Sequence, residues 1–232
     1  MSEICGSNHT KIFFHRHQSC ILSLNLLILP IIPINTTILA TTMKIQTATK
    51  SQAQIISQLI MTAMTDDCCQ YFAGENHTLA DFHSMMTSLV EREDSQYSYL
   101  NTLVAIDNDG DVMGAIVGYD GGKLHELRRA FINAAKECFG RDFSRMDDET
   151  QAGEVYLDSL AVMPDHRGKG IATSLLRAMI EKAAKEGHSA VGLLVDKGNP
   201  NAERMYLHVG FEYANDSSWG GHPMRHLVYR ID

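Results

Sequence analysis

Residues 162–173 place a glycine-containing turn between a strand-like run and a helical run. Gly168 and Gly170 carry no side chain that would keep a bulky ligand away from the backbone. The helix that follows presents unpaired N–H groups and the positive end of its dipole at the same place. Arg167 and Lys169 add two positive charges. The turn therefore predicts an anion site suited to a phosphate or a pyrophosphate.

The helical run, residues 171–186, repeats apolar residues at steps of three and four, which predicts one buried face. The turn before it fits neither of two common phosphate-binding patterns. A Walker A loop needs four residues between its first glycine and the Gly-Lys pair, whereas one residue separates Gly168 from Gly170. A dinucleotide fingerprint needs a third glycine where this chain has Thr173. By itself, the turn is also compatible with a plain strand-to-helix connection whose basic residues are solvated.

A second pattern follows after one more strand. Residues 190–195 form a short apolar run, and residues 199–211 read Asn-x-x-Ala-x-x-x-Tyr-x-x-x-Gly-Phe. The segment 160–172, with Leu-Ala-Val-x-Pro before Arg-x-x-Gly-x-Ala, resembles motif A of the GNAT superfamily of N-acetyltransferases. The pattern at 199–211 is similar to motif B of the same superfamily. Two such motifs in the right order, separated by one helix and one strand, are much more specific than either alone.

This resemblance implies an α+β fold: a mixed, mostly antiparallel central sheet with splayed fourth and fifth strands and helices on both faces. In that fold the pantetheine arm of acetyl-CoA inserts between the splayed strands, and the turn holds its pyrophosphate. An ordinary helix N-cap is the alternative role for Asn199. The positions that would contact acetyl-CoA are Leu160, Ala161, Val162, Arg167, Gly168, Lys169, Gly170, Ile171, Ala172, Thr173, Asn199 and Tyr206.

Acetyl transfer from a thioester to an amine needs a base, donors for the thioester oxygen and an acid for the thiolate. By resemblance, Tyr206 is the acid; a core tyrosine on an amphipathic helix is the alternative. For the base we expect Asp158, with Glu154 second, because strand alternation gives both the same face as Leu160 and Val162. Backbone N–H groups around Leu160 and Val162 would polarise the carbonyl. The chain is thus expected to be an acetyl-CoA-dependent N-acetyltransferase, the alternative being a non-catalytic acyl-CoA sensor or partner-binding module.

Aromatic residues in two segments are candidates for contact with the acceptor amine. The helical pattern lapses at residues 66–74, and in the resembling fold this region lines the acceptor pocket. Residues 215–224 are expected to form a loop that joins the last two strands and closes over the acceptor. A helix over 123–139 is expected as an elaboration that covers or shapes the acceptor side. The candidates are Tyr71, Phe72, Trp219 and His222, each with a core or solvated position as the alternative.

Charge and cysteine usage limit the partners. The formal charge of −8 argues against nucleic acid, which requires a basic face, and mildly favours a cationic acceptor such as a small-molecule or peptide amine. The five cysteines have no C-x-x-C spacing, so we expect neither a disulfide framework nor a zinc site. Residues 107–111 resemble a calcium loop but lack its glycine and glutamate, so they predict a hairpin turn and no metal.

The first 42 residues differ in character from the rest. Basic residues and histidines precede an apolar segment at 21–40 that two prolines and several polar residues interrupt. A signal or anchor has this order of features, but a spanning helix needs about 20 mainly apolar residues. We expect residues 1–42 to be a disordered or mis-annotated extension and residues 43–232 to be the acetyltransferase domain. A cytoplasmic protein without membrane partner, monomeric or homodimeric, is the expectation.

Overall fold

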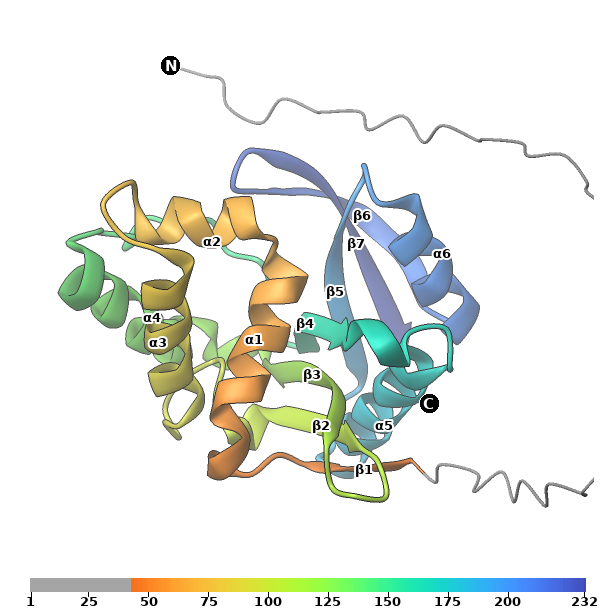
Figure 1. The fold of residues 1–232 in the computed structure, drawn as a ribbon. Helices are drawn as coiled ribbons and strands as arrows, with labels where there is room; N and C mark the ends of the chain where they lie inside the picture. Colours follow the sequence, from red (N-terminus) through yellow and green to blue (C-terminus); the bar gives the residue numbers. More distant parts are fainter. Residues whose placement is uncertain (1–42) are drawn as a thin grey trace, which may run out of the picture. The chain divides into compact units, whose positions relative to one another are not determined.

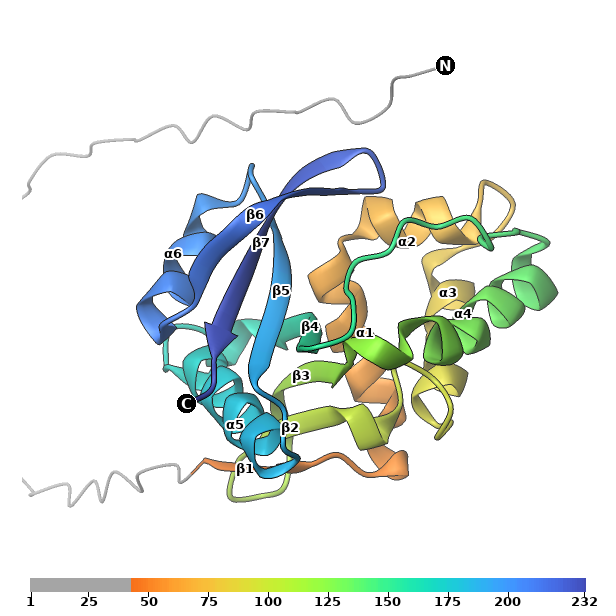
Figure 2. The same cartoon turned by 180° about the vertical axis from the view of Figure 1, so that it is seen from behind.

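The computed structural model describes residues 43–232 (Figures 1 and 2), and the predicted extension, residues 1–42, lies outside the described residues. Within the described part, seven strands form one sheet in the order β1-β2-β3-β4-β5-β7-β6. Neighbouring strands are antiparallel except β4 and β5, which run parallel. The strands are β1 (Lys44–Thr47), β2 (Thr102–Ile106), β3 (Val112–Asp120), β4 (Val155–Val162), β5 (Ala190–Asp196), β6 (Glu212–Trp219) and β7 (His222–Arg230).

Helices cover both faces of this sheet, as the two opposite views in Figures 1 and 2 show. The first four α-helices share one buried cluster with β2, β3 and β4, and the last two belong to a second cluster on the other face. A mostly antiparallel sheet between two helical layers confirms the predicted fold class. The α-helices are α1 (Ala53–Met64), α2 (Asp66–Ala73), α3 (Leu79–Val90), α4 (Leu124–Phe139), α5 (Ile171–Lys185) and α6 (Pro200–Val209).

Helix α5 is anchored by the apolar face that its sequence predicts. Leu175, Leu176, Met179 and Ala183 are fully buried against the sheet. Burial of one large apolar side chain contributes about 1.5–3 kcal/mol, so this face fixes the helix firmly on the sheet. The helix begins directly after Gly170, and its N-terminus is therefore held beside the end of β4.

Strands β4 and β5 separate soon after they meet. Their pairing is limited to Val155 with Val191 and Tyr156 with Gly192. Beyond these pairs β4 continues beside β3, and β5 continues beside β7. The second half of β4 and the second half of β5 thus have no partner on the sides that face each other. This opening confirms the predicted splay of the fourth and fifth strands.

A β-bulge in β4 corrects the predicted alternation. The register with β3 shifts so that Ser159 pairs with Val117 and Leu157 with Gly118, which leaves Asp158 as the extra residue. Asp158 therefore faces the α1–α4 side, as Ser159 does, whereas Leu160 packs into the α5 cluster on the other side. The expectation that Glu154, Asp158, Leu160 and Val162 share one face is wrong, because uninterrupted alternation requires a strand without a bulge.

The lapse predicted at residues 66–74 is also wrong, because residues 66–73 form helix α2. Thr65 separates α1 from α2 with φ 75°, an uncommon conformation for a β-branched residue. Its hydroxyl oxygen accepts a hydrogen bond from the Cys68 N–H at 3.4 Å and so caps α2. The chain thus turns sharply while remaining helical on both sides, which a purely periodic pattern does not reveal.

The loop predicted at residues 215–224 is instead a long β-hairpin. Strand β6 runs to Trp219, β7 begins at His222, and only Gly220 and Gly221 lie between them. Both glycines have positive φ, 59° and 81°, as a tight two-residue hairpin turn requires. The hairpin arches over the top of the molecule in Figure 1 toward α2. There the Gly220 N–H donates to Asp147 Oδ2 at 3.1 Å.

Candidate active site

The turn before α5 has the geometry that an anion site needs. Gly168 and Gly170 have φ of 74° and 77°, and a Cβ on either would meet nothing within 4 Å, so the space in front of the backbone is open. The Arg167 N–H donates to the Pro164 carbonyl and the Ser174 N–H to the Gly170 carbonyl; between these two, no backbone N–H is paired with a protein acceptor in the described structure. The N–H groups from residue 168 to residue 173 are therefore available to a ligand.

The two basic side chains of this turn fold back onto the backbone. The Arg167 Nε–H donates to the Val162 carbonyl at 3.1 Å, and Lys169 Nζ donates to the Asp165 carbonyl at 3.0 Å. Both residues are exposed. Their charges thus lie at the mouth of the turn, and the bond from Arg167 ties the turn to the end of β4.

The register of β4 turns specific backbone groups into the opening between β4 and β5. The Met163 N–H donates to the Met113 carbonyl at 2.8 Å, so residue 163 belongs to a hydrogen-bonded pair with β3. Hydrogen-bonded pairs alternate along an antiparallel ladder, so Ala161 also bonds to β3. The N–H groups of Leu160 and Val162 then point the other way, into the opening. Two parallel donors in a gap that continues into the glycine turn form an extended site for a ligand with a carbonyl at one end and phosphates at the other.

Tyr206 lies on α6 beside this opening. Its ring packs edge-on against Phe211 with centroids 5.9 Å apart, and burial raises the pKa of its phenol to about 12. Tyr206 is thus a protonated phenol at neutral pH. Asn199 caps α6, since its Oδ1 accepts from the Ala202 N–H at 3.1 Å.

Asp158 belongs to a cluster of polar side chains on the α1–α4 side of β4, the polar cluster. Its Oδ1 accepts from Ser159 Oγ at 2.8 Å, and its Oδ2 accepts from Gln96 Nε2 at 3.3 Å. Burial, and then the negative charge of Glu149, raises the pKa of Asp158 to about 6. A carboxylate that takes up a proton near neutral pH and remains partly accessible has the properties of a general base.

Glu154, the second candidate base, is engaged elsewhere. Its carboxyl accepts from Thr150 Oγ1 at 2.7 Å and bonds to His226 Nε2 at 2.9 Å. The other ring nitrogen of His226 lies 3.1 Å from Asn215 Oδ1. Glu154 is buried directly under Gly192, where β4 and β5 part. These contacts link the start of β4 to β7 and β6 at the point of separation.

The segment around α4 contributes a buried network beside Asp158. Arg128 forms ion pairs with Glu149 and with Asp148, the latter at 3.1 Å, and donates to the Asp147 carbonyl at 3.0 Å. The Tyr119 hydroxyl donates to Glu149 Oε1 at 2.9 Å. The predicted helix at 123–139 therefore does shape this side of the sheet. Its charged residue Arg128 is buried.

The four predicted acceptor residues do not form one group. Phe72 is buried in the aromatic core and lies 6.4 Å from Trp219, centroid to centroid. The indole Nε1 of Trp219 is buried without a partner in the described structure. Tyr71 is 62% exposed, with the Arg141 guanidinium over its ring. His222, at the hairpin, has Nδ1 3.8 Å from Asp196 Oδ2. Phe72 thus contacts both Trp219 and Tyr71, whose ring centroid is 5.4 Å away, while His222 is exposed at the hairpin turn.

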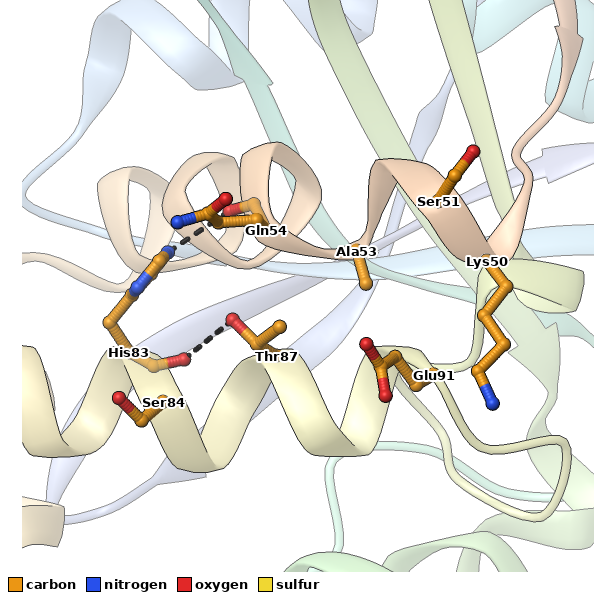
Figure 3. Close-up of a pocket in the computed structure, with 8 residues that line it drawn as sticks. All are labelled: Lys50, Ser51, Ala53, Gln54, His83, Ser84, Thr87 and Glu91. Carbon is orange, nitrogen blue, oxygen red and sulfur yellow. Dashed lines mark hydrogen bonds between the residues drawn. The ribbon is translucent and has the colours of Figure 1, made fainter.

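A separate polar pocket lies between the start of α1 and α3 (Figure 3). It is lined by Lys50, Ser51, Ala53, Gln54, His83, Ser84, Thr87 and Glu91, and His83 Nε2 lies 3.0 Å from the Gln54 carbonyl. None of the predicted site residues lines it. The described residues contain no cluster of three or more potential metal ligands, and residues 107–111 form the tight connection of β2 to β3. No helix in residues 43–232 has the length and apolarity to cross a membrane.

Fold and site together define a protein with a split sheet and an anion-binding helix N-terminus at the open end of the split. A model of the Acetyltransferase (GNAT) family matches residues 62–211, well over half of the chain. The chain therefore belongs to the GNAT acetyltransferase family.

Two curated relatives and two solved structures extend this finding. A mouse thialysine N-epsilon-acetyltransferase is 33% identical over 82 residues, covering 33% of this chain and 48% of the relative. An uncharacterised N-acetyltransferase of Methanocaldococcus jannaschii is 41% identical over 59 residues, covering 25% of this chain and 24% of the relative. The matches thus span at most about half of these relatives.

Among solved structures, a crystal structure of an acetyltransferase is similar with a TM-score of 0.66 and 27% identity, over 82% of this chain and 100% of that one. An N-acetyltransferase from Staphylococcus aureus Mu50 is similar in fold, with a TM-score of 0.67 and 20% identity, over 80% of this chain and 100% of that one. These likenesses support the same architecture over nearly all of the described residues.

Proposed function

We propose that this protein is an acetyl-CoA-dependent N-acetyltransferase that transfers the acetyl group directly to an amine of a small molecule or a peptide. The observation that carries the proposal is the continuity of the β4–β5 opening with the glycine turn of α5. Backbone donors line this path at Leu160, at Val162 and over residues 168–173, and no Cβ obstructs it at Gly168 or Gly170. Membership of the GNAT family supports the reaction class.

The residues fit the cosubstrate in a definite order. N–H groups from residue 168 to residue 173 and the positive end of α5 would bind the pyrophosphate, with Arg167 and Lys169 at the mouth. The N–H groups of Leu160 and Val162 would hold the pantetheine arm and the thioester oxygen. When bound, the cosubstrate supplies an activated acetyl thioester. Ala161 and Asn199 would contribute backbone and helix-cap positions beside the arm.

The chain's own residues then handle protons and charge. An ammonium group has no lone pair, so the acceptor must lose a proton before it can react, and Asp158 is the base that takes it. The amides of Leu160 and Val162 stabilise the negative charge that develops on the thioester oxygen. Tyr206, still protonated at neutral pH, donates a proton to the departing sulfur. Glu154 supports the split sheet and is the less suitable base, because Thr150 and His226 occupy its carboxyl.

The acceptor amine would approach from the α1–α4 side of β4, where the polar cluster lies. The carboxyl groups of Asp158 and Glu149 make this cluster acidic, which favours a cationic amine. Phe72 and Trp219 would form an aromatic wall, and Tyr71 and His222 would lie at the entrance. A relative named for thialysine is compatible with a small-molecule acceptor. We further propose the cytoplasm as the compartment and a monomer or homodimer as the working form.

Release of free coenzyme A from acetyl-CoA across a panel of small amines and peptides tests the proposal. Turnover with at least one amine, and acetylation of that amine by mass spectrometry, is the expected result. Binding of acetyl-CoA by calorimetry without turnover for every amine would instead favour the non-catalytic sensor on the same fold.

A further inference from the structure

Gln96 lies in the connection between α3 and β2 and is 3% exposed. Its side-chain Nε2 donates to Asp158 Oδ2 at 3.3 Å, while its Oε1 is buried with no hydrogen-bond partner in residues 43–232. If the amide were turned round, its carbonyl would face the carboxylate of Asp158, and two acceptors cannot form a hydrogen bond. The NH₂ group must therefore face Asp158, which leaves Oε1 as the atom without a partner. A buried carbonyl without a partner is unusual in a native protein and indicates a site where a donor arrives.

The surroundings of Oε1 restrict what that donor can be. The Gln96 amide is bonded to Asp158, so its open carbonyl and the Asp158 carboxyl are two acceptors side by side. The cation Arg128 is held by Glu149 and Asp148, and the buried Arg128 Nε and Trp219 Nε1 have no partner among the described residues, so neither of them satisfies Oε1. A ligand group with several N–H donors on one atom satisfies two adjacent acceptors at once. An amine is such a group.

The support of Gln96 is rigid, which suits a group that orients a substrate. Asn101 Nδ2 donates to the backbone carbonyls of Ser95 and Gln96 at 3.1 and 3.2 Å. The Tyr97 N–H donates to Ser95 Oγ at 3.1 Å. These bonds hold the segment around Gln96 before any ligand is present, so the position of Oε1 beside Asp158 is preorganised.

From this geometry we propose that Gln96 orients the acceptor amine, its side-chain carbonyl accepting one N–H while Asp158 takes another proton; the inference rests on the proposed acetyl transfer. An ammonium R–NH₃⁺ carries three hydrogens. Asp158 takes one, which frees the lone pair that forms the N–C bond to the acetyl carbon as the C–S bond breaks. A second proton leaves the nitrogen and replaces the one that Tyr206 gives to the departing sulfur, and the third remains in the amide product. Gln96 bonds to this retained N–H throughout.

A secondary amine lacks the retained hydrogen. R–NH₂⁺–CH₃ keeps one N–H after Asp158 has taken the first proton, and this last hydrogen must leave as the thiol forms, so Gln96 Oε1 loses its partner before the amide product is complete. Sites that hydrogen-bond a substrate group discriminate strongly against analogues that lack it. The kcat/KM of the protein should therefore be about ten- to a hundredfold higher for a primary amine than for its N-methyl derivative.

The experiment uses the full chain and an amine accepted in the panel above, its N-methyl derivative, and an isomer with the methyl group on the adjacent carbon. The isomer has the same bulk but keeps all three hydrogens, so it separates steric exclusion from loss of the hydrogen bond. Rates are measured at pH 8, where Asp158 is ionised. Gln96→Met removes the carbonyl at similar volume, and Gln58→Met, on the exposed side of α1, is the matched control.

The wild-type protein and Gln58→Met should prefer the primary amine and its branched isomer over the N-methyl derivative. Gln96→Met should lower kcat for the primary amine and abolish most of the preference, with acetyl-CoA binding unchanged by calorimetry. Equal rates for the primary and N-methyl amines in the wild type, or an unchanged preference in Gln96→Met, would overturn the inference. If Gln96→Met does not fold, the ratio of wild-type rates for the primary and the N-methyl amine still tests the inference. A wild type that acetylates no amine refutes the proposed function instead.

Discussion

A methyl group on Gly192 would enter space that the Glu154 carboxyl occupies. An ideal Cβ at Gly192 lies 1.9 Å from Glu154 Oε2 and 2.3 Å from its carboxyl carbon. In Gly192→Ala the carboxyl must therefore move, and it can do so because a glutamate side chain is flexible. The move separates it from His226 Nε2 and Thr150 Oγ1, now 2.9 and 2.7 Å away. The cost arises from these lost contacts in a buried place.

The size of that cost follows from the two contacts. Leaving a buried polar group without its hydrogen bond costs about 1–3 kcal/mol, so losing both bonds costs about 2–6 kcal/mol. Alanine inside a strand is otherwise about 0.5–1 kcal/mol more favourable than glycine. We expect Gly192→Ala to lower the free energy of unfolding by about 3 kcal/mol, near the middle of the resulting range.

Urea unfolding, followed by the fluorescence of Trp219, the single tryptophan of the sequence, measures this change. A double-mutant cycle supplies the control, since Glu154→Ala removes the carboxyl that the methyl group meets. In the Glu154→Ala background, Gly192→Ala should be neutral or stabilising by up to about 1 kcal/mol. Equal effects of Gly192→Ala in both backgrounds would refute the reasoning, because the two positions would then be independent.

Three further predictions concern the reaction. Gly170→Asp places a negative charge and a strained φ at the phosphate turn and should weaken acetyl-CoA binding at least about tenfold by calorimetry. Gly187→Asp, with φ 83° at the other end of α5, controls for strain and should bind normally. Tyr206→Phe should lower kcat more than it changes KM, and unaffected turnover in steady-state kinetics would exclude it as the acid. The proposed base Asp158 would act in its ionised form, and its pKa is raised to about 6, so log kcat/KM should fall below about pH 6 and be constant above it. Asp158→Asn should lose most of the activity, and the decrease below pH 6 should disappear.

The parts of the structure that follow from local pattern were predictable. The turn at 162–173 and the helix after it depend on glycines and a 3.6-residue repeat, and both are visible in the sequence. The splay was implied by the family resemblance that the two motifs carry together. In the structure, the pairing of β4 with β5 stops at Tyr156 and Gly192. The Gly220-Gly221 pair was an available signal for a tight hairpin that a loop assignment overlooked.

Other features depend on contacts between distant parts of the chain. The bulge at Asp158 arises from the register of β4 against β3, and one strand alone does not show it. Gln96 lies 62 residues before Asp158 and in no motif, so only the fold brings them together. The same holds for His226 and Glu154. Buried polar residues of this kind have no periodic signature, because their positions are set by partners and not by an apolar face.

The bulge in β4 has a geometric consequence for the whole site. The carboxylate of Asp158 and the N–H groups of Leu160 and Val162 are neighbours along one covalent chain, separated by a few bonds of strand. Their spacing is set by backbone dimensions, so exchange of residues in α2, α4 or the hairpin does not alter it. The surrounding residues can therefore vary in size and charge to suit different amines, while the proposed base and the proposed donors to the thioester oxygen stay adjacent along one strand.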